Sequence, residues 1–124
     1  MIEESYVSFN TAKLLKEAGF DVPCTSQYTE GKSIWNVGYP DNFNQDEFGY
    51  SRPTQALAAR WLREVHKIHV GADMAYSKLV AEKWIYLIRF TDSIGNPYKG
   101  VGWFNDYEEA LEAGLQEAVK LIKK

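Results

Sequence analysis

Residues 53–70 read PTQALAARWLREVHKIHV, and this stretch decides the fold. Its charged residues fall on one side of a helix, and a strand pattern follows almost at once. We therefore predict a helix that begins near Pro53, with Ser51 or Thr54 as its N-cap, and runs directly into a strand at 68–75. The apolar stripe of that helix is formed by Leu57, Ala58, Trp61, Leu62 and Val65.

The chain before this stretch predicts one helix and two strands. Ser8 is a good N-cap, and Gly19 stands where a helix ends in a left-handed residue, followed by Phe20 in position to contact the last turn. The segments 24–29 and 32–37 then flank Glu30-Gly31, which is a short hairpin signal. We expect a helix followed by a β-hairpin.

The chain after this stretch predicts further strands and a final helix. The clearest strand is 82–91, whose apolar residues on both faces indicate a central position in a sheet. A second strand is expected at 98–104 after a turn rich in Asp, Gly, Asn and Pro. The last helix begins at Asn105 or Asp106, because Asp106 and Glu109 have the spacing of a capping box.

These elements predict a single α+β domain over residues 1–124. The expected order is α-ββ-α-βββ-α, with a mostly antiparallel sheet and helices packed on one face. The 45% content of hydrophobic residues and the 15% content of aromatic residues exclude a disordered chain. The expected core contains Trp61, Leu62, Trp84, Ile88, Leu111 and Leu115.

Charge and cysteine content limit the classes of function. The formal net charge of −3 gives no general attraction to nucleic-acid backbones. Cys24 is the only cysteine, so no internal disulfide forms, and a reducing compartment is the simplest setting. The start of the chain lacks the features of a signal peptide, and no apolar run is long enough to span a bilayer. We expect a cytoplasmic protein without a membrane partner.

Three segments carry a family resemblance: 8–24 (SFNTAKLLKEAGFDVPC), 53–69 (PTQALAARWLREVHKIH) and 107–122 (YEEALEAGLQEAVKLI). Together, in this order, they resemble a family of small uncharacterised proteins of Bacteroides-type gut bacteria and of their phages and mobile elements. The segment 38–51 and the strands after His69 resemble that family much less. The resemblance implies a small cytoplasmic accessory protein of phage or mobile-element origin, and it implies no activity.

The residues with chemical potential form no recognisable catalytic or metal-binding pattern. His66 and His69 have zinc-like spacing, but a zinc site needs two more ligands, so we expect helix-end and sheet positions for them instead. Cys24 has no base nearby in sequence, which indicates a buried thiol. A solvated helix face accounts for Glu108, Glu109 and Glu112. We therefore expect no enzyme, no metal and no cofactor.

The segment 38–51 is long for a connection and is rich in aromatic residues among polar ones, which is typical of an interaction loop. We predict that the chain binds a protein partner through this region. The alternative that its rings complete the core remains open. The candidate contacts are Trp35, Tyr39, Phe43, Phe48 and Tyr50.

Basic residues around the helix of residues 53–66 give a second hypothesis. They outnumber the single acid Glu64 on that side, and a local basic patch can bind phosphates in an acidic protein. We keep a nucleic-acid-binding accessory factor as the alternative function. Its candidate residues are Arg52, Arg60, Arg63 and Lys67.

Overall fold

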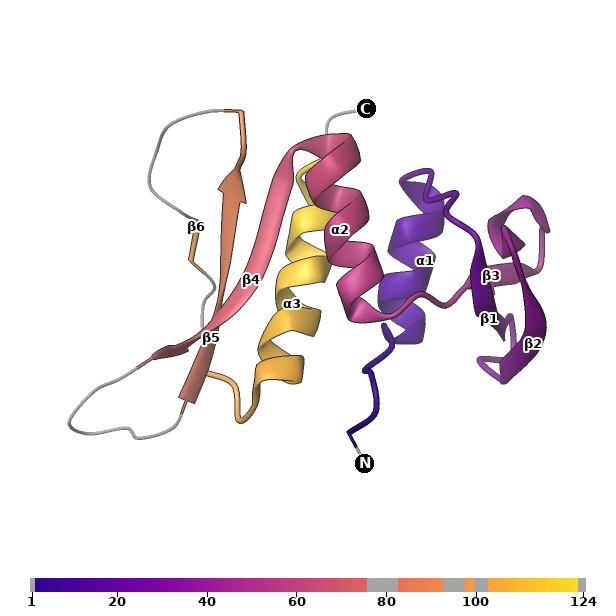
Figure 1. The fold of residues 1–124 in the computed structure, drawn as a ribbon, viewed down its shortest axis with the longest axis horizontal. Coiled ribbons are helices and arrows are strands. Elements are labelled where there is room, and N and C mark those ends of the chain that lie inside the picture. The colour runs from indigo at the N-terminus through magenta and orange to yellow at the C-terminus, as the bar shows by residue number, and fades with distance from the viewer. Residues whose placement is uncertain (1, 76–82, 93–97, 100–102, 123–124) are drawn as a thin grey trace.

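The computed structural model describes residues 2–75, 83–92, 98–99 and 103–122. These residues form an α+β fold with antiparallel strand pairs, which confirms the predicted fold class (Figure 1). The elements in chain order are α1 (Phe9–Glu17), β1 (Cys24–Thr29), β2 (Ile34–Asp41), the 3-10 turn η1 (Phe43–Gln45), β3 (Gly49–Ser51), α2 (Gln55–His66), β4 (Ile68–Ala75), β5 (Lys83–Phe90), β6 (Tyr98–Lys99) and α3 (Tyr107–Lys120).

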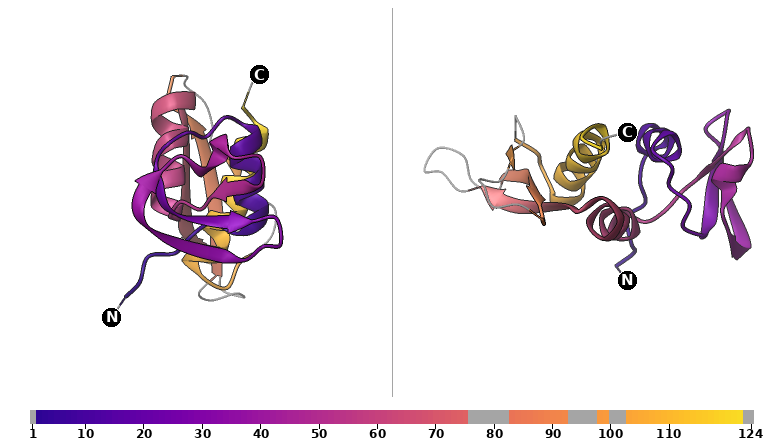
Figure 2. Two further views of the ribbon diagram at one scale, coloured as in Figure 1. Left: turned by 90° about the vertical axis from the view of Figure 1, so that its right-hand side faces the viewer. Right: turned by 90° about the horizontal axis from the view of Figure 1, so that it is seen from above.

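The strands of the described residues form two sheets, where the sequence predicted one. The first sheet has the order β2-β1-β3 and the second has the order β4-β5-β6. The helices lie between them, as the view from above in Figure 2 shows. The strand β3 was missed because its three residues lie inside the segment that was expected to be a loop; they pair with Gln27, Tyr28 and Thr29 of β1.

The helix ends follow the local signals in the sequence. The Ser8 side chain accepts a hydrogen bond from the Thr11 amide at the start of α1. Gly19 has a φ of +93° beyond the end of α1. The Phe20 amide donates to the Leu15 carbonyl over 2.9 Å, and the Gly19 amide donates to the Lys16 carbonyl over 3.1 Å. These two bonds are the Schellman pattern that the Gly-Phe pair predicted.

The stretch at 53–70 folds as predicted, as a helix that runs into a strand. The Thr54 side chain caps α2 by accepting from the Leu57 amide over 3.1 Å. Only Lys67 separates α2 from β4, and its left-handed conformation, with a φ of 60°, turns the chain sharply. The strand β4 therefore returns beside the helix that precedes it.

One core joins the two sheets through the helices. Five of the six predicted core side chains are buried, and Trp84 is only partly buried. The same cluster of buried residues extends into the first half of the chain through Leu15, Phe20 and Tyr28. The rings of Phe20 and Trp61 meet with their centroids 5.2 Å apart. The first half of the chain is therefore packed directly on α2.

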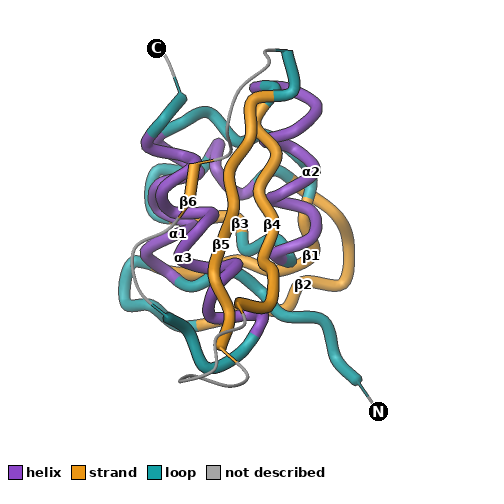
Figure 3. The backbone as a smooth tube through the Cα atoms, turned by 90° about the vertical axis from the view of Figure 1, so that its left-hand side faces the viewer, coloured by secondary structure: helices purple, strands orange, loops and turns teal. Residues whose placement is uncertain are grey.

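The helices contact the second sheet in different ways. The helix α3 contacts both β4 and β5, whereas α2 contacts β4 and lies beside the edge of the sheet that β4 forms (Figure 3). The backbone of α3 comes close to the strands at Gly114, where an added Cβ would lie 2.8 Å from the Cβ of Tyr86. The predicted packing of helices on a sheet is therefore found here, with α3 on β4 and β5 and α2 on β4.

The helices α1, α2 and α3 run in the same direction, so their first turns gather at one end of the described structure (Figure 1). Their starts are joined by side chains. Glu112 of α3 accepts a hydrogen bond from the Ser8 amide over 2.9 Å and another from the Thr11 hydroxyl at the start of α1. Gln55 at the start of α2 donates through its Nε2 to Glu112 Oε1 over 3.0 Å. We call this group the helix-start junction.

Candidate functional site

The five aromatic residues predicted to contact a partner divide into exposed and packed side chains. Trp35 and Tyr39 are each 59% exposed, and Phe48 is 58% exposed. Phe43 is 8% exposed, and Tyr50 is half-buried. Some of these rings are therefore exposed and others complete the core, which are the two alternatives that the sequence left open. Phe43 is buried and is no longer a candidate contact residue.

Polar contacts explain why residues 42–51 are packed instead of forming an open loop. The Lys16 ammonium of α1 donates to the carbonyls of Asp46 and Gly49 over 2.6 Å each. The Asn44 amide nitrogen donates to the Phe20 carbonyl, and its oxygen accepts from the Ser51 amide, over 2.8 Å each. These bonds tie η1 and β3 to α1, and sequence spacing alone could not indicate such long-range partners.

Tyr50 is held in the same way, by aromatic and cationic neighbours. Its ring meets the Phe9 ring at a centroid distance of 5.0 Å, and the Lys16 ammonium lies 4.7 Å from its centroid. Tyr50 therefore belongs to the packing between α1 and the first sheet.

The exposed rings lie at opposite edges of the first sheet. Trp35 and Tyr39 are on β2, together with Ile34, which is 49% exposed. Phe48 directly precedes β3, and β2 and β3 are the two outer strands of the sheet. We call the exposed apolar residues of this outer strand, Ile34, Trp35 and Tyr39, the β2 surface; Ile34 and Trp35 are consecutive and therefore lie on opposite faces of the strand. Phe48 is a separate exposed ring.

The strand β2 is irregular where it carries Tyr39. Cys24 of β1 pairs with Asp41, and Ser26 pairs with Asn36. Two steps along β1 therefore correspond to five along β2. Residues 37–40 therefore bulge away from the ladder, and Pro40 lies within them. Apart from Val37, all residues of β2 are exposed.

The basic residues around α2 are also divided by the fold. The Arg52 guanidinium lies 4.0 Å from the centroid of the Tyr6 ring, and its Nη1 donates to Ser26 Oγ over 3.1 Å. Arg52 is therefore half-buried against the first sheet and does not belong to the outer side of α2.

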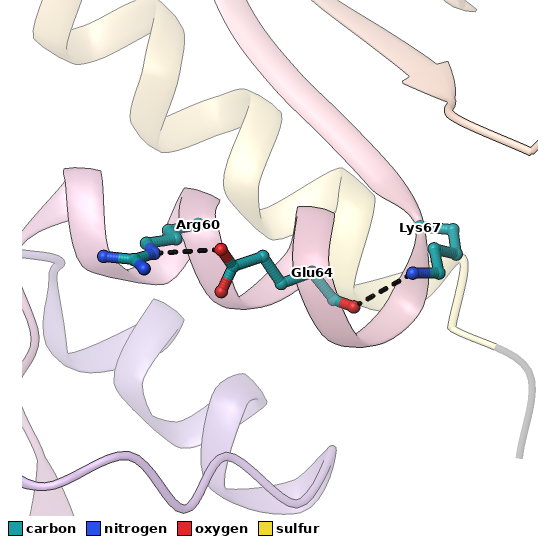
Figure 4. A network of polar contacts seen from close by, with 3 residues as sticks. All are labelled: Arg60, Glu64 and Lys67. Atoms are coloured by element: carbon teal, nitrogen blue, oxygen red, sulfur yellow. Dashed lines mark hydrogen bonds and ion pairs between the residues drawn. The ribbon is translucent and has the colours of Figure 1, made fainter.

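Glu64 engages two of the remaining basic residues (Figure 4). Arg60 Nε lies 3.1 Å from Glu64 Oε1, and the Lys67 ammonium donates to the Glu64 carbonyl over 3.4 Å. Arg63 is exposed and has no ion-pair partner within the described part of the chain. The predicted nucleic-acid surface is thus reduced to Arg63 and Lys67, which have no ion-pair partner among the described residues, beside the Arg60–Glu64 ion pair.

The histidines occupy the helix-end and sheet positions expected for them. His66 is the last residue of α2, and its ring meets the Trp61 ring at a centroid distance of 4.7 Å. His69 is on β4, opposite Arg89 of β5, and lines a different cavity from His66. Across residues 2–75, 83–92, 98–99 and 103–122, no three His, Cys, Asp or Glu side chains are grouped so that they could hold a metal ion.

Cys24 lies in a setting that makes its thiol unreactive. The residue is 5% exposed, and its Sγ donates to the Val22 carbonyl over 3.4 Å. Burial raises the pKa of the Cys24 thiol to about 11. The thiol is therefore protonated at neutral pH and is a poor nucleophile.

Asp106, Glu109 and Glu112, at the start of α3, have structural partners, whereas Glu108 is exposed. Glu109 accepts from the Asn105 amide over 3.2 Å, and Asp106 accepts from the Glu109 amide over 2.8 Å. This is the predicted capping box, except that the Glu109 carboxylate accepts from the Asn105 amide instead of the amide of the N-cap residue Asp106. Glu112 serves the helix-start junction, a role that sequence reasoning missed because its partners come from α1 and α2.

A cleft between α2 and β4 is the remaining feature of note. Its volume is about 750 Å³, and the first turn of α3 and residues 2–5 also contribute to its walls. We call it the α2–β4 groove. Its strand side is formed by residues 69–72, and its helix side by Ala56, Ala59, Arg60 and Arg63.

Comparisons with models of protein families, with curated proteins and with solved structures found no match to this chain. Within its described residues, the protein contains no helix that is both long and apolar enough to cross a membrane.

Proposed function

We propose that the chain is a small non-enzymatic accessory protein that binds another protein through the β2 surface. The carrying observation is that Ile34, Trp35 and Tyr39 are between 49% and 59% exposed on one outer strand. Large aromatic side chains are enriched at the centres of protein interfaces, because their burial gives much contact area at low entropic cost. The β2 surface offers two such anchors.

The support beneath this surface favours binding without rearrangement. Residues 34–36 pair with residues 26–28 of β1, and Tyr28 of β1 is buried in the core. The Tyr28 hydroxyl donates to the Val7 carbonyl over 2.6 Å. Trp35 therefore projects from a strand that is fixed to the core through its neighbour, and little ordering entropy is lost on binding.

The charges next to the β2 surface have both signs. Lys32 precedes β2 and Asp41 ends it, and both are exposed, whereas Asp46 and Glu47 lie beside Phe48 at the opposite edge of the sheet. The large apolar side chains, and not the charge, therefore support this surface as the site for a partner that presents apolar groups.

An accessory role in a phage or mobile element is part of the same proposal. It rests on the family resemblance of the three helical segments, and on the structural roles of the residues that could have been catalytic. Cys24 is buried, and Glu109 and Glu112 serve helix starts.

Affinity capture from a host lysate tests the proposal. The immobilised wild-type chain is compared with a double variant, Trp35→Ala with Tyr39→Ala, and with the matched control Phe48→Ala at the opposite edge of the sheet. We expect proteins that the wild type and F48A retain and the double variant loses. Identical capture by all three proteins would rule out the β2 surface as the binding site.

Nucleic-acid binding through Arg63 is the second candidate, because this exposed arginine has no acidic partner among the described residues. Binding to single-stranded or duplex DNA at low salt should then weaken steeply as salt is added. Arg63→Glu should abolish it. Absence of binding by the wild-type chain at low salt would eliminate this candidate.

A further inference from the structure

The α2–β4 groove lies along the edge of the second sheet. Four consecutive residues of β4, His69 to Ala72, line it. Because side chains alternate between the two faces of a strand, a cavity over one face would be lined by every second residue. Consecutive lining residues mean that the groove runs beside the strand. The other side of β4 is occupied by β5, and the order β4-β5-β6 leaves the groove side unpaired among the described strands.

The pairing register shows which backbone groups face this groove. The Thr91 amide donates to the Lys67 carbonyl over 2.8 Å, immediately beyond the pair Ile68–Phe90. Bonded and non-bonded pairs alternate along an antiparallel ladder. The residues of β4 that bond to β5 are therefore those at odd-numbered positions, like Lys67. The amides and carbonyls of Val70 and Ala72 therefore point toward the groove. The amide of Met74, which like Val70 and Ala72 is at an even-numbered position, donates to the Asp73 side chain over 2.8 Å and not to β5, which agrees with this assignment.

The walls of the groove beside β4 carry small side chains. The residues of α2 that line the groove include Ala56 and Ala59, which have the smallest side chains after glycine. Val70 and Leu111, which are 4% and 5% exposed, lie at its apolar base. Residues 69–72 span roughly 10 Å at the rise of a strand, which matches three or four residues of an added segment.

Charges differ between the two ends of the groove. Glu3, Glu4 and Glu108 line it near the start of α2, where the Gln55 amide donates to the Ser5 carbonyl over 2.8 Å. Arg63 lies eight residues further along α2, roughly 12 Å away at the rise of an α-helix. One end of the groove is therefore acidic, and the other carries Arg60 and Arg63.

We propose that the α2–β4 groove binds an extended segment of a partner protein, which adds to the open edge of β4 as a further strand. Backbone hydrogen bonds to Val70 and Ala72 hold the segment, as in other cases of strand addition. An acidic side chain of the segment faces Arg63, and a basic one lies at the end formed by Glu3, Glu4 and Glu108. This site is independent of the β2 surface. A nucleic acid fits it less well, because three glutamates line the same groove.

Selection from a random displayed-peptide library tests the groove. The wild-type chain is the target, and Ala56→Trp, which fills the groove from an exposed position, is the counter-target. We expect enriched peptides that contain both an acidic and a basic residue and bind A56W at least tenfold more weakly. Arg63→Glu should weaken them about tenfold, and the matched charge reversal Arg89→Glu, on an exposed β5 residue outside the groove, should leave binding within twofold. The W35A/Y39A double variant should bind them normally, so the two proposed sites can fail separately.

Amide hydrogen exchange supplies the readout that distinguishes strand addition from other docking. A bound peptide should slow exchange at Val70 and Ala72 and leave His69 and Gly71, which already bond to β5, unchanged. Ala72→Pro removes one groove-facing donor without breaking a bond to β5. It should therefore lower the affinity of the peptides, and it replaces A56W as the test variant if A56W does not fold.

Three results would overturn the proposal. The first is a library that yields no peptide sensitive to A56W or A72P. The second is protection that falls on residues outside β4. The third is a single-stranded oligonucleotide that binds in an R63E-sensitive manner when no peptide is enriched, which would assign the groove to nucleic acid.

Discussion

The outer strands β2 and β4 present two different kinds of surface. The strand β2 is bulged and carries Pro40, and its exposed features are the side chains of Ile34, Trp35 and Tyr39. The strand β4 pairs with β5 without a break from Ile68 to Ala75, and its distinguishing feature is a row of backbone groups that no described strand pairs with on the side away from β5. Bulges and prolines prevent strand addition at an edge, whereas a regular edge permits it. The first sheet is therefore suited to recognition by side chains, and the second to recognition by backbone.

The comparison has physical meaning only if both sheets belong to one cooperative unit. Phe20, which is 1% exposed, carries the contact between the first half of the chain and Trp61 of α2. We predict that Phe20→Ala lowers the free energy of unfolding by about 4 kcal/mol, the cost of deleting a buried ring. Urea denaturation, monitored by hydrogen exchange of amides in both sheets, should show one shared unfolding transition. Separate transitions would mean that the sheets belong to independent domains.

The second sheet should tolerate added volume less well than the first. A Cβ at Gly114 would lie 2.8 Å from the Tyr86 Cβ and 3.0 Å from a Val70 methyl, whereas one at Gly38 meets nothing within 4 Å. We predict that Gly114→Val destabilises the protein by about 3 kcal/mol through overpacking. Its control, Gly38→Val, should change stability by less than about 0.5 kcal/mol. Equal effects in urea denaturation would contradict the close contact of α3 with the strands.

The helix-start junction connects the first half of the chain to the second. In Glu112→Gln, one carboxylate oxygen becomes an NH₂ group that faces a donor from α1 or α2. We predict a loss of about 2 kcal/mol, since hydrogen bonds to charged groups are lost and a donor is left unpaired. The exposed Glu108→Gln is the matched control and should change little. Thermal unfolding of both variants measures the difference, and a neutral E112Q would show that the junction does not stabilise the fold.

Alkaline pH should act on the first sheet through Cys24 of β1. Its thiol has a pKa of about 11 in the folded state, against an ordinary value of 9.0, so the unfolded chain loses its proton first as the pH rises. The contribution of Cys24 is complete below pH 9 and is lost as the pH approaches 11, with a loss of about 1 kcal/mol at pH 10. Comparison with Cys24→Ala removes the effect of other titrating groups. An identical slope of stability against pH in the two proteins would refute this assignment.

The ion pair beside the α2–β4 groove should contribute least. Arg60 and Glu64 are highly exposed and lie four residues apart on α2. We predict that Arg60→Ala lowers the free energy of unfolding by about 0.3 kcal/mol, and by less in high salt. Chemical denaturation at low and at high salt measures this difference. A loss above about 1 kcal/mol would show a structural role for Arg60 that its exposure does not suggest.

Local signals in the sequence correctly predicted the caps of α1, α2 and α3, because each cap depends on residues within one turn. They also predicted the direct passage from α2 to β4. Pairings between distant segments were not visible: β3 has three residues and is defined by β1, and the fate of Phe43 depends on Ser51, Asn44 and α1. The division of the strands into two sheets follows from how the helices pack between them, which periodicity does not encode.

The exposure of the candidate contact residues was predicted in part. Trp35, Tyr39 and Phe48 are exposed, but no pattern in the sequence indicates that Phe48 lies at the other edge of the sheet. The α2–β4 groove could not be predicted, because it requires the strand register and the position of residues 2–5.

The shared direction of the three helices also has an electrostatic consequence. Each helix carries partial positive charge at its start and partial negative charge at its end, and three parallel helices add these charges instead of cancelling them. The side chains oppose this sum: Glu108 and Glu109 lie in the first turn of α3, whereas Lys16 and Lys120 lie in the last turns of α1 and α3. The placement of charge along the chain thus limits the dipole moment of the folded molecule. A redesign that reversed the charge order of one helix would leave that moment uncompensated.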